Sequence, residues 1–296
     1  MVEIKIDDRT IAAEKGQSIL EALIAAGVLL RSDCGGKGRC GKCRVRIIEA
    51  APNAISAIDD TEAANLDQNE RDAGTRLACR AELAGAVALE VPEDSRLSPE
   101  VARKGPPLLF QRLKQNRTTI SQSSGHRWGL AVDLGTTTIA VYLCDRQTAS
   151  VAASMSVRNP QAVFGDDVMS RIGAARTDTA SLVRMQRLVV KSLDWAAENI
   201  CTAAQVSPGQ VQELVVVGNP TMIHLLLGED PSSIGIYPYR PNFVDRRNVS
   251  AKTIGLKFNP TAQVITMPLI TGFIGSDIVA AALAAELDSR PSGTLL

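Results

Sequence analysis

Aromatic residues are scarce in this chain: two Trp, three Tyr and five Phe make up 3% of its 296 residues. Proteins that stack nucleic-acid bases on a sheet depend on aromatic side chains, so base recognition is not expected as the main function. Net charge is absent as well, because 32 basic and 32 acidic residues balance. No overall field would draw the chain to nucleic acid or to an anionic membrane.

Long apolar runs are also missing. No stretch approaches the roughly 18 residues that span a bilayer, and residues 1–8 lack the basic and then apolar order of a signal peptide. We therefore expect a cytoplasmic protein with no membrane and no nucleic-acid partner. The G-x-x-x-x-G-K-[ST] motif does not occur either, which excludes a P-loop nucleotide site. A hydrophobic content of 45% still allows packed cores, and the length favours about two domains.

The sign of the charge changes along the chain. Residues 1–95 are net acidic, whereas residues 96–127 hold seven basic residues against Glu100 alone. Three prolines and a polar Ser/Gln-rich end give this stretch the composition of a connector. We predict a first domain over 1–95, a basic Pro/Ser-rich linker over 96–127, and two further subdomains over 128–206 and 207–296, the second incomplete.

Four of the six cysteines fall within the first 79 residues. Cys34, Cys40 and Cys43 form C-x5-C-x2-C, and Cys79 follows after 35 residues. A disulfide framework belongs to secreted proteins, which nothing here indicates, and structural zinc usually takes two short cysteine pairs where this chain has one. Three thiolates from one loop and a fourth from a distant strand end suit a [2Fe–2S] cluster. A zinc knuckle or free buried thiols are the alternatives.

The residues between these cysteines favour the cluster. Four glycines allow positive φ and close backbone approach, so that successive amide groups can point at sulfur: Gly35, Gly36, Gly38 and Gly41. Three basic residues add positive charge nearby: Lys37, Arg39 and Lys42. The loop also satisfies G-x-G-x-x-G, but a dinucleotide site needs a strand before that motif and a helix after it. Here a helix is expected before the loop and a strand after it, so a dinucleotide site is rejected.

The flanking pattern predicts a small α/β domain. Residues 2–13 alternate as a hairpin, and Ser18 and Glu21 form a capping box that opens a helix ending at Gly27. Further strands are expected at 45–48 and 87–91. Together with the cysteine spacing, this order resembles the β-grasp ferredoxins over residues 1–93. The resemblance implies that the stretch ending in Cys79 delivers the fourth cluster ligand.

A second motif follows the predicted linker. Two apolar, β-rich runs within residues 128–143 flank the turn Asp133-Leu134-Gly135-Thr136-Thr137-Thr138, which predicts a hairpin. The N–H and hydroxyl groups of such a turn can hold a phosphate, and the strand-end carboxylate can hold Mg²⁺ through water. An ordinary hairpin with a Thr-rich turn is the alternative. The run resembles the first phosphate loop of the actin-like (ribonuclease H-like) ATPases, which implies an α/β domain that binds ATP and Mg²⁺ through Asp133, Gly135, Thr136, Thr137 and Thr138.

The remaining segments are mostly structural. Apolar residues at helical spacing predict a helix over 179–204, and a buried strand at 211–217 leads through the motif Gly-Asn-Pro-Thr-Met into another helix. A third helix is expected from Ile278 to about residue 287. Cys144 and Cys201 lack partner spacing and are expected to be buried structural thiols. His224 is expected to pack in the core rather than bind cobalt, and His126 to be solvated.

An N-terminal [2Fe–2S] domain, a basic linker and the motifs Asp-x-Gly-Thr-Thr-Thr and Gly-Asn-Pro-Thr-Met together resemble the reductive activators of corrinoid proteins. The resemblance implies that the cluster domain takes an electron from a low-potential donor and delivers it to the corrinoid protein of a methyltransferase system, returning Co(II) to Co(I). It implies ATP binding by the actin-like part. No catalytic residue is assigned, and the oligomeric state is left open, with a homodimer as one option.

One feature departs from the pattern of that family. Residues 291–296 resemble a turn and the start of a strand, whereas the family's second phosphate motif, Asp-x-Gly-Thr-Asn, does not occur in the sequence. We therefore expect a fragment or a truncated product with one wall of an ATP site and a complete electron-transfer half. Two alternatives remain: a plain [2Fe–2S] ferredoxin with a partner-binding appendage and no use of ATP, and a kinase-like phosphotransferase with a sensory cluster.

Overall fold

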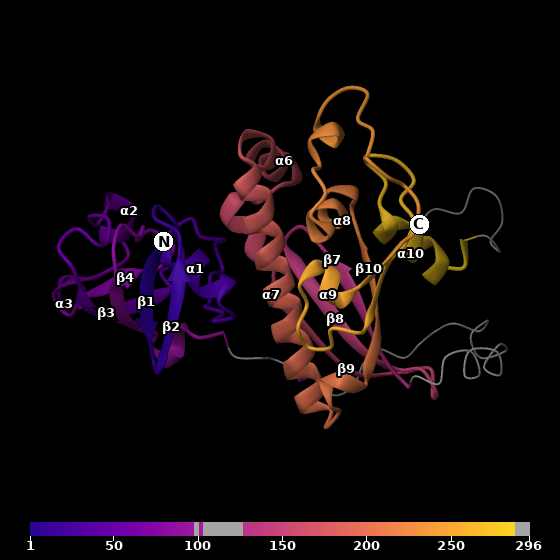
Figure 1. The fold of residues 1–296 in the computed structure, drawn as a ribbon, viewed down its shortest axis with the longest axis horizontal. Coiled ribbons are helices and arrows are strands. Elements are labelled where there is room, and N and C mark those ends of the chain that lie inside the picture. Colours follow the sequence, from indigo (N-terminus) through magenta and orange to yellow (C-terminus); the bar gives the residue numbers. More distant parts are fainter. Residues whose placement is uncertain (98–100, 103–126, 288–296) are drawn as a thin grey trace. The chain divides into compact units, whose positions relative to one another are not determined.

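The computed structural model describes residues 1–97, 101–102 and 127–287 (Figure 1). The chain divides into two compact units, Met1–Ser98 with Pro160–Gly165, and Pro99–Asn159 with Asp166–Leu296. Most of the predicted linker, including His126, and the predicted turn at 291–296 lie outside the described residues. The domain bounds drawn from the sequence stay a prediction, and strands from both sides of the bound at residue 206 share one sheet.

Five strands build the sheet of the first unit in the order β2-β1-β5-β3-β4. Their bounds are Val2–Ile6 (β1), Arg9–Ala13 (β2), Arg44–Ala50 (β3), Thr75–Leu77 (β4) and Val87–Glu90 (β5). β1 pairs with β5 in parallel, and the other neighbours pair antiparallel. This is the β-grasp arrangement expected from the sequence.

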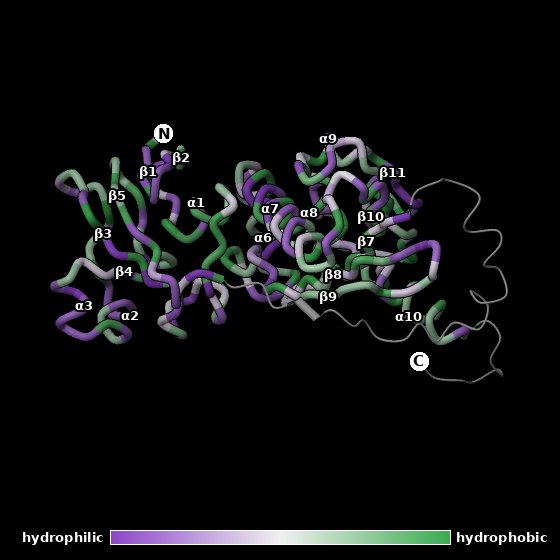
Figure 2. The backbone as a smooth tube through the Cα atoms, turned by 90° about the horizontal axis from the view of Figure 1, so that it is seen from below, coloured by the Kyte–Doolittle hydropathy of each residue, from purple (hydrophilic) through white to green (hydrophobic). Residues whose placement is uncertain are grey.

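Three helices complete this unit: α1 (Ile19–Ala25), α2 (Asp60–Ala63) and α3 (Gln68–Asp72), with a 3-10 turn at Glu93–Ser95. The Ser18 hydroxyl caps α1 as predicted, accepting the Glu21 N–H at 3.2 Å. Leu20 and Leu23 of α1 are fully buried, as are Ile4 and Ile6 of β1, and these side chains form the core. The two short helices α2 and α3 were not predicted, and the chain around α3 is mainly hydrophilic (Figure 2).

The second unit is built on a seven-stranded sheet in the order β11-β12-β10-β7-β8-β9-β6. The strands are β6 (Val101–Ala102), β7 (Trp128–Leu134), β8 (Thr138–Asp145), β9 (Ser150–Arg158), β10 (Val211–Gly218), β11 (Arg247–Ser250) and β12 (Gln263–Thr266). β7, β10 and β12 are mutually parallel. Their carboxyl ends therefore share one edge of the sheet, where α/β proteins usually bind ligands.

The helices of the second unit are α6 (Val168–Thr177), α7 (Thr179–Ala203), α8 (Pro220–Leu227), α9 (Ala251–Ile254) and α10 (Ser276–Ala284). The second unit also has two short 3-10 turns, η3 (Pro208–Gln210) and η4 (Ser232–Gly235), whereas η2 (Pro160–Phe164) belongs to the first unit. α7 crosses β8 and β9 (Figure 1), and its predicted apolar stripe is buried, with Met185, Leu188 and Val189 fully so. None of the helices in the described ranges is long and apolar enough to span a bilayer.

Two short parts of the predicted linker belong to the two units. In the first unit the Arg96 guanidinium pairs with the Asp7 carboxylate at 2.9 Å, and the Leu97 N–H donates to the Leu29 carbonyl at 2.9 Å. In the second unit β6 pairs with β9 at the sheet edge. Residues 96–97 and 101–102 of the predicted linker are therefore parts of the two units.

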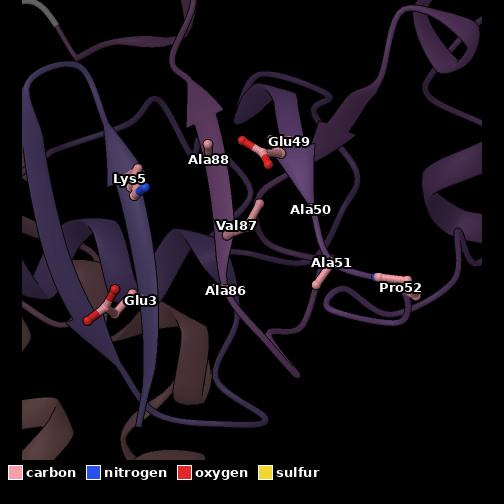
Figure 3. Close-up of a pocket in the computed structure, with 9 residues that line it drawn as sticks. All are labelled: Glu3, Lys5, Glu49, Ala50, Ala51, Pro52, Ala86, Val87 and Ala88. Atoms are coloured by element: carbon pink, nitrogen blue, oxygen red, sulfur yellow. The ribbon is translucent and has the colours of Figure 1, made fainter.

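A groove of about 420 Å³ lies over the outer face of the first sheet (Figure 3). Small side chains form its floor, including alanines from β3 and β5. Glu3, Lys5 and Glu49 lie at its sides. None of the four cysteines of the predicted cluster site lines it. The groove is therefore not part of the cysteine site.

His224 is a fully buried residue of α8 with both ring nitrogens engaged. Nδ1 lies 2.7 Å from the Pro220 carbonyl oxygen, and Nε2 accepts the Asn242 N–H at 3.1 Å. The ring stacks on Phe243 with centroids 4.4 Å apart. Burial lowers the pKa of His224 below its usual value. The neutral ring therefore has a structural role, as the sequence predicted.

Because the folded state lowers this pKa, the unfolded chain binds the proton more readily. We expect the stability of the second unit to be complete above about pH 6.5 and to decline as the pH falls through that value. Urea unfolding followed by tryptophan fluorescence tests this, since Trp128 and Trp195 both lie in the second unit. His224→Phe keeps the stacking and removes the titration, so its unfolding midpoint should depend less on pH. An equal dependence in both proteins would contradict the prediction.

Candidate functional site

The cysteine loop connects α1 to β3. Its backbone turns through glycines with positive φ, including +73° at Gly38. A Cβ atom at Gly38 would lie 2.7 Å from Cγ2 of Thr61, so only glycine fits there. The loop entry is held by Ser32, whose hydroxyl accepts the Gly36 N–H at 3.0 Å. The glycine pattern seen in the sequence thus serves close packing as well as the turn.

The structure gathers the four predicted cysteines as two thiol pairs, Cys34 with Cys40 and Cys43 with Cys79. Burial alone would raise the pKa of Cys34, but hydrogen bonds from loop amides and from the Cys40 thiol outweigh it and lower that pKa. The hydrogen bond from the Cys79 thiol lowers the pKa of Cys43 and raises that of Cys79. The Gly38 N–H reaches the sulfur of Cys79, so a loop amide is already directed at a thiol from the distant strand end.

The four thiols and the amides directed at them are the donor set that an iron-sulfur cluster needs. A structural zinc would require all four thiols around one centre, whereas a [2Fe–2S] cluster is bound by four thiolates shared between two irons. The donor set of two adjacent pairs with inward-facing amides therefore fits the cluster.

A buried ion pair places β4, the strand that ends just before Cys79. Glu62 of α2 is fully buried, and its carboxylate accepts from Nε of Arg76 at 2.7 Å and from Nη2 at 2.8 Å. The same carboxylate accepts the Leu77 N–H at 2.7 Å. The adjoining Ala78 N–H donates to the Cys43 carbonyl at 2.8 Å. Sequence reasoning missed Glu62 because an acidic residue in a polar stretch gives no sign of burial.

Further polar contacts fix the loop from the same side. Nδ2 of Asn65 donates to the Gly38 carbonyl at 2.9 Å, and the Arg44 guanidinium donates to the Gly41 carbonyl and to Glu70. Nε of Arg80, next to Cys79, donates to Asp59 at 2.8 Å. The segment 59–72, absent from the predicted elements, thus forms the support of the cysteine site.

The second predicted site lies at the shared carboxyl edge of the parallel strands. The hairpin of β7 and β8 forms as predicted, with Gly135, Thr136 and Thr137 in the turn. A Cβ atom at Gly135 would lie 2.5 Å from the Thr138 carbonyl oxygen, so the turn requires glycine. Thr137 and Thr138 are exposed, and Thr136 is half-buried.

Three side chains from separate elements converge on this turn. Nδ2 of Asn159 donates to the Gly135 carbonyl at 2.9 Å, and Nδ2 of Asn219 donates to Oγ1 of Thr136 at 3.0 Å. The guanidinium of Arg171 is fully buried and donates to the Thr136 carbonyl at 2.7 Å. Burial lowers the pKa of Arg171 to about 10, a value at which it still carries its charge near neutral pH. The motifs at 159 and 219 thus meet at the hairpin.

A carboxylate pair and an apolar cavity lie beside the turn. Partial desolvation and then the nearby Asp277 raise the pKa of Asp133. A cavity of about 300 Å³ extends from Asp133 between the outer face of the sheet and α10, with apolar walls that include Tyr142, Val217 and Leu283. α10 begins at Ser276, two residues before the predicted start, where the Ser276 hydroxyl accepts the Gly218 N–H at 3.0 Å.

The two other cysteines lie apart from these sites. Cys201 is fully buried in α7, as expected. Cys144 is only half-buried on β8, so the expectation of burial was wrong for this residue. The reason is that Cys144 lies on the outer face of its strand, which is less completely covered than the face under α7.

We expect Cys79→Ser to remove or grossly change the EPR signal of the reduced cluster, because one iron loses a thiolate. Iron and acid-labile sulfide analysis of anaerobically purified protein should show the loss directly. Cys144→Ser is the matched control and should leave both unchanged. Wild-type protein that contains zinc and no iron would contradict the assignment.

Removing Glu62 should destabilise the first unit by about 3–5 kcal/mol, because Arg76 would keep a buried charge without its partner. Adding Arg76→Met to Glu62→Leu should recover part of this loss but not all, since the Leu77 N–H still lacks its acceptor. Visible absorbance of the cluster during urea unfolding reports on this unit, because both tryptophans lie in the other one. A double variant as unstable as the single one would argue against the pair.

Comparison with known proteins places both units. Residues 2–84 match the family described as 2Fe-2S iron-sulfur cluster binding domain, and residues 128–290 match the RACo middle region. A corrinoid activation enzyme, RamQ of Eubacterium limosum, is 31% identical over 163 residues, which are 55% of this chain and 28% of RamQ. One component of the Na⁺-translocating NADH-quinone reductase of Yersinia pestis is 35% identical over 94 residues, 31% of this chain and 22% of that component.

A solved structure supports the fold. The reductive activator for corrinoid,iron-sulfur protein has a TM-score of 0.54 with 23% identity, covering 98% of this chain and 58% of that one. The chain thus spans less than two thirds of the relatives that it matches. With an N-terminal domain of the 2Fe-2S cluster-binding type and with more than half of its length matching the second family, this chain belongs to the RACo middle region family.

Proposed function

We propose that this chain is the electron-delivering part of a reductive activator, which passes one electron to the Co(II) corrinoid of a methyltransferase system and returns it to Co(I). The observation that carries the proposal is the gathering of three thiols of the cysteine loop with the Cys79 thiol, in a chain of the RACo middle region family. The name of RamQ, a corrinoid activation enzyme, points to the same reaction. The four ligands would be Cys34, Cys40, Cys43 and Cys79.

A [2Fe–2S] cluster of the ferredoxin type supplies one-electron transfer at a low potential, near −400 mV in plant-type proteins (an order-of-magnitude guide). The residues of this chain determine how exposed the cluster site is and how its negative charge is stabilised. Cys43 is almost completely buried, whereas Cys34, Cys40 and Cys79 are partly accessible, so one side of the site is open to a partner. Amide groups of the loop stabilise negative charge on sulfur. A low-potential donor protein would supply the electron.

We further propose that the hairpin contributes one wall of an ATP site. The amides and hydroxyls of Gly135, Thr136, Thr137 and Thr138 would face the phosphates, and Asp133 would hold Mg²⁺ through water. Asn219 and Arg171 fix the turn from behind, so the exposed groups remain available for a ligand. ATP can assist the reduction only if it binds two conformations with different affinity. A cytoplasmic location and a homodimer belong to the same proposal.

The proposed reaction can be tested with a corrinoid protein purified from the same organism and held as Co(II) without oxygen. The chemically reduced chain should convert its absorption spectrum to that of Co(I), whereas Cys79→Ser should not, since it lacks the cluster. Absence of any conversion by the cluster-loaded wild type would rule out the proposed function.

Adding ATP to the same assay distinguishes the main proposal from a plain ferredoxin. In a chain extended past Leu296, ATP should accelerate the reduction, and Gly135→Ala should abolish the acceleration because a Cβ would displace the Thr138 carbonyl. Electron transfer without ATP should be unchanged in that variant, because Gly135 lies in the second unit. No effect of ATP in the extended chain would favour the ferredoxin with a partner-binding appendage.

A further inference from the structure

Exposed apolar side chains gather on two loops of the second unit, one after η4 and the other before α10. We name them the aromatic patch, which consists of Ile236, Tyr237, Tyr239, Val244, Ile270, Phe273 and Ile274. Tyr237 is 82% exposed and Phe273 is 69% exposed. In a chain with only 3% aromatic residues, three exposed rings in one place are unusual. Exposed apolar groups of this kind mark interaction sites more often than chance.

The two loops form one continuous surface. The ring of Tyr239 lies 5.2 Å from that of Phe273 and 6.1 Å from that of Tyr237, centroid to centroid. The Leu269 N–H donates to the Val244 carbonyl at 2.8 Å. A Cβ atom at Gly272 would lie 2.1 Å from the Tyr239 carbonyl oxygen, so the backbones of the loops touch. In Figure 1 the orange loop after α8 and the yellow loop before α10 accordingly lie together.

Buried anchors hold the patch in place. Beneath the first loop, Asn242 and Phe243 contact the fully buried His224 through a hydrogen bond and a ring stack. In the second loop, the Thr271 hydroxyl accepts the N–H groups of Phe273 and Ile274, each at 3.1 Å. The rings are therefore presented on an ordered backbone. A partner would not have to order these loops on binding, which lowers the entropic cost of association.

The border of the patch is basic. Arg240, Arg246 and Arg247 are exposed, and Asp245 is the acidic residue between them. Arg247 lies over the Phe243 ring at 4.5 Å. Within the part of the chain that the structure describes, neither Arg240 nor Arg246 has an ion pair with a carboxylate. Their charges are therefore available to a partner.

From these contacts we propose that the aromatic patch docks the corrinoid protein, through a surface of that protein with an apolar centre and a border of Asp and Glu. The inference rests on the proposed function for the identity of the partner. Tyrosine and arginine dominate the energetic centres of protein interfaces, which fits exposed rings within an arginine border. Complementary acidic charges would steer the partner onto the patch.

Other occupants fit the charges less well. In a symmetric dimer through this patch, the arginine borders of both copies would lie in one interface, and like charges brought close together are unfavourable. An anionic membrane would attract the same arginines, but it has no fixed arrangement of apolar and acidic groups to match the rings and their border. An acidic protein partner avoids both difficulties.

The test measures how tightly the cluster-loaded chain binds the corrinoid protein of the same organism. The corrinoid protein is purified and kept in its Co(II) state. Tyr237→Ala and Phe273→Ala should each weaken the affinity at least about tenfold, the effect of a side chain at an interface centre. Val183→Ala removes a side chain that is 50% exposed on α7 and is the matched control, which should bind as wild type does. Tryptophan fluorescence during thermal unfolding should confirm that the variants remain folded.

Charge reversal gives an independent measurement. Arg240→Glu combined with Arg246→Glu should slow association and reduce its dependence on salt, with a smaller effect on dissociation. Sedimentation velocity and binding to anionic phospholipid vesicles are measured on the same variants. Substitutions that alter self-association or vesicle binding while leaving affinity for the corrinoid protein unchanged would overturn the docking proposal.

The two proposals can fail separately. If wild type binds and reduces the corrinoid protein and the patch variants bind equally well, the docking surface lies elsewhere and the proposed function stands. If the wild type neither binds nor reduces it, the proposed function is wrong and this partner is excluded.

Discussion

The carboxylate of Glu62 is the contact on which the cysteine site depends. Three of its thiols come from one loop, but the fourth follows a strand far along the chain, and nothing in the loop itself can draw that strand into place. Glu62 does so by accepting from Arg76 and from the Leu77 N–H. Burying such a pair costs desolvation and adds little net stability. The ion pair instead fixes the position of β4, because any other position of this strand would leave a buried charge without a partner.

The hairpin of β7 and β8 depends on strand direction instead. Since β7, β10 and β12 run parallel, the residues that follow them meet at one edge without any long-range ion pair. Asn219 follows β10 directly, and Asn159 follows β9, which ends at the same edge because it runs antiparallel to β8. Both amides reach the turn between β7 and β8. The polar groups at this edge are therefore a consequence of topology, and the buried Arg171 then fixes the turn from below.

The sequence was sufficient for those features that repeat locally. Strand alternation, the cap at Ser18 and the apolar stripe of α7 are each set by residues close together in the sequence, so these elements could be predicted, whereas the cluster ligands stay a prediction from the cysteine spacing. The segment 59–72 could not be, because α2 and α3 are too short for helical periodicity and Glu62 looks like any surface acid. The role of Arg171 was equally invisible, since its partner is a backbone carbonyl 35 residues away in the chain. Cys144 was misjudged because a strand pattern does not say how well each face is covered.

The Glu62 ion pair lies in the first unit, and the hairpin contacts lie in the second. This separation bears on how energy could be coupled to electron transfer. If the corrinoid has a lower potential than the cluster, each ~59 mV of difference in a one-electron step costs a factor of ten in equilibrium. Neither the ion pair of Glu62 nor the hairpin includes a residue of the other. On the proposed function, ATP would assist by acting on the acceptor, holding the corrinoid protein in a state that is easier to reduce. An ordered, exposed binding surface on the unit that carries the hairpin is what such a mechanism requires, and the aromatic patch lies on that unit.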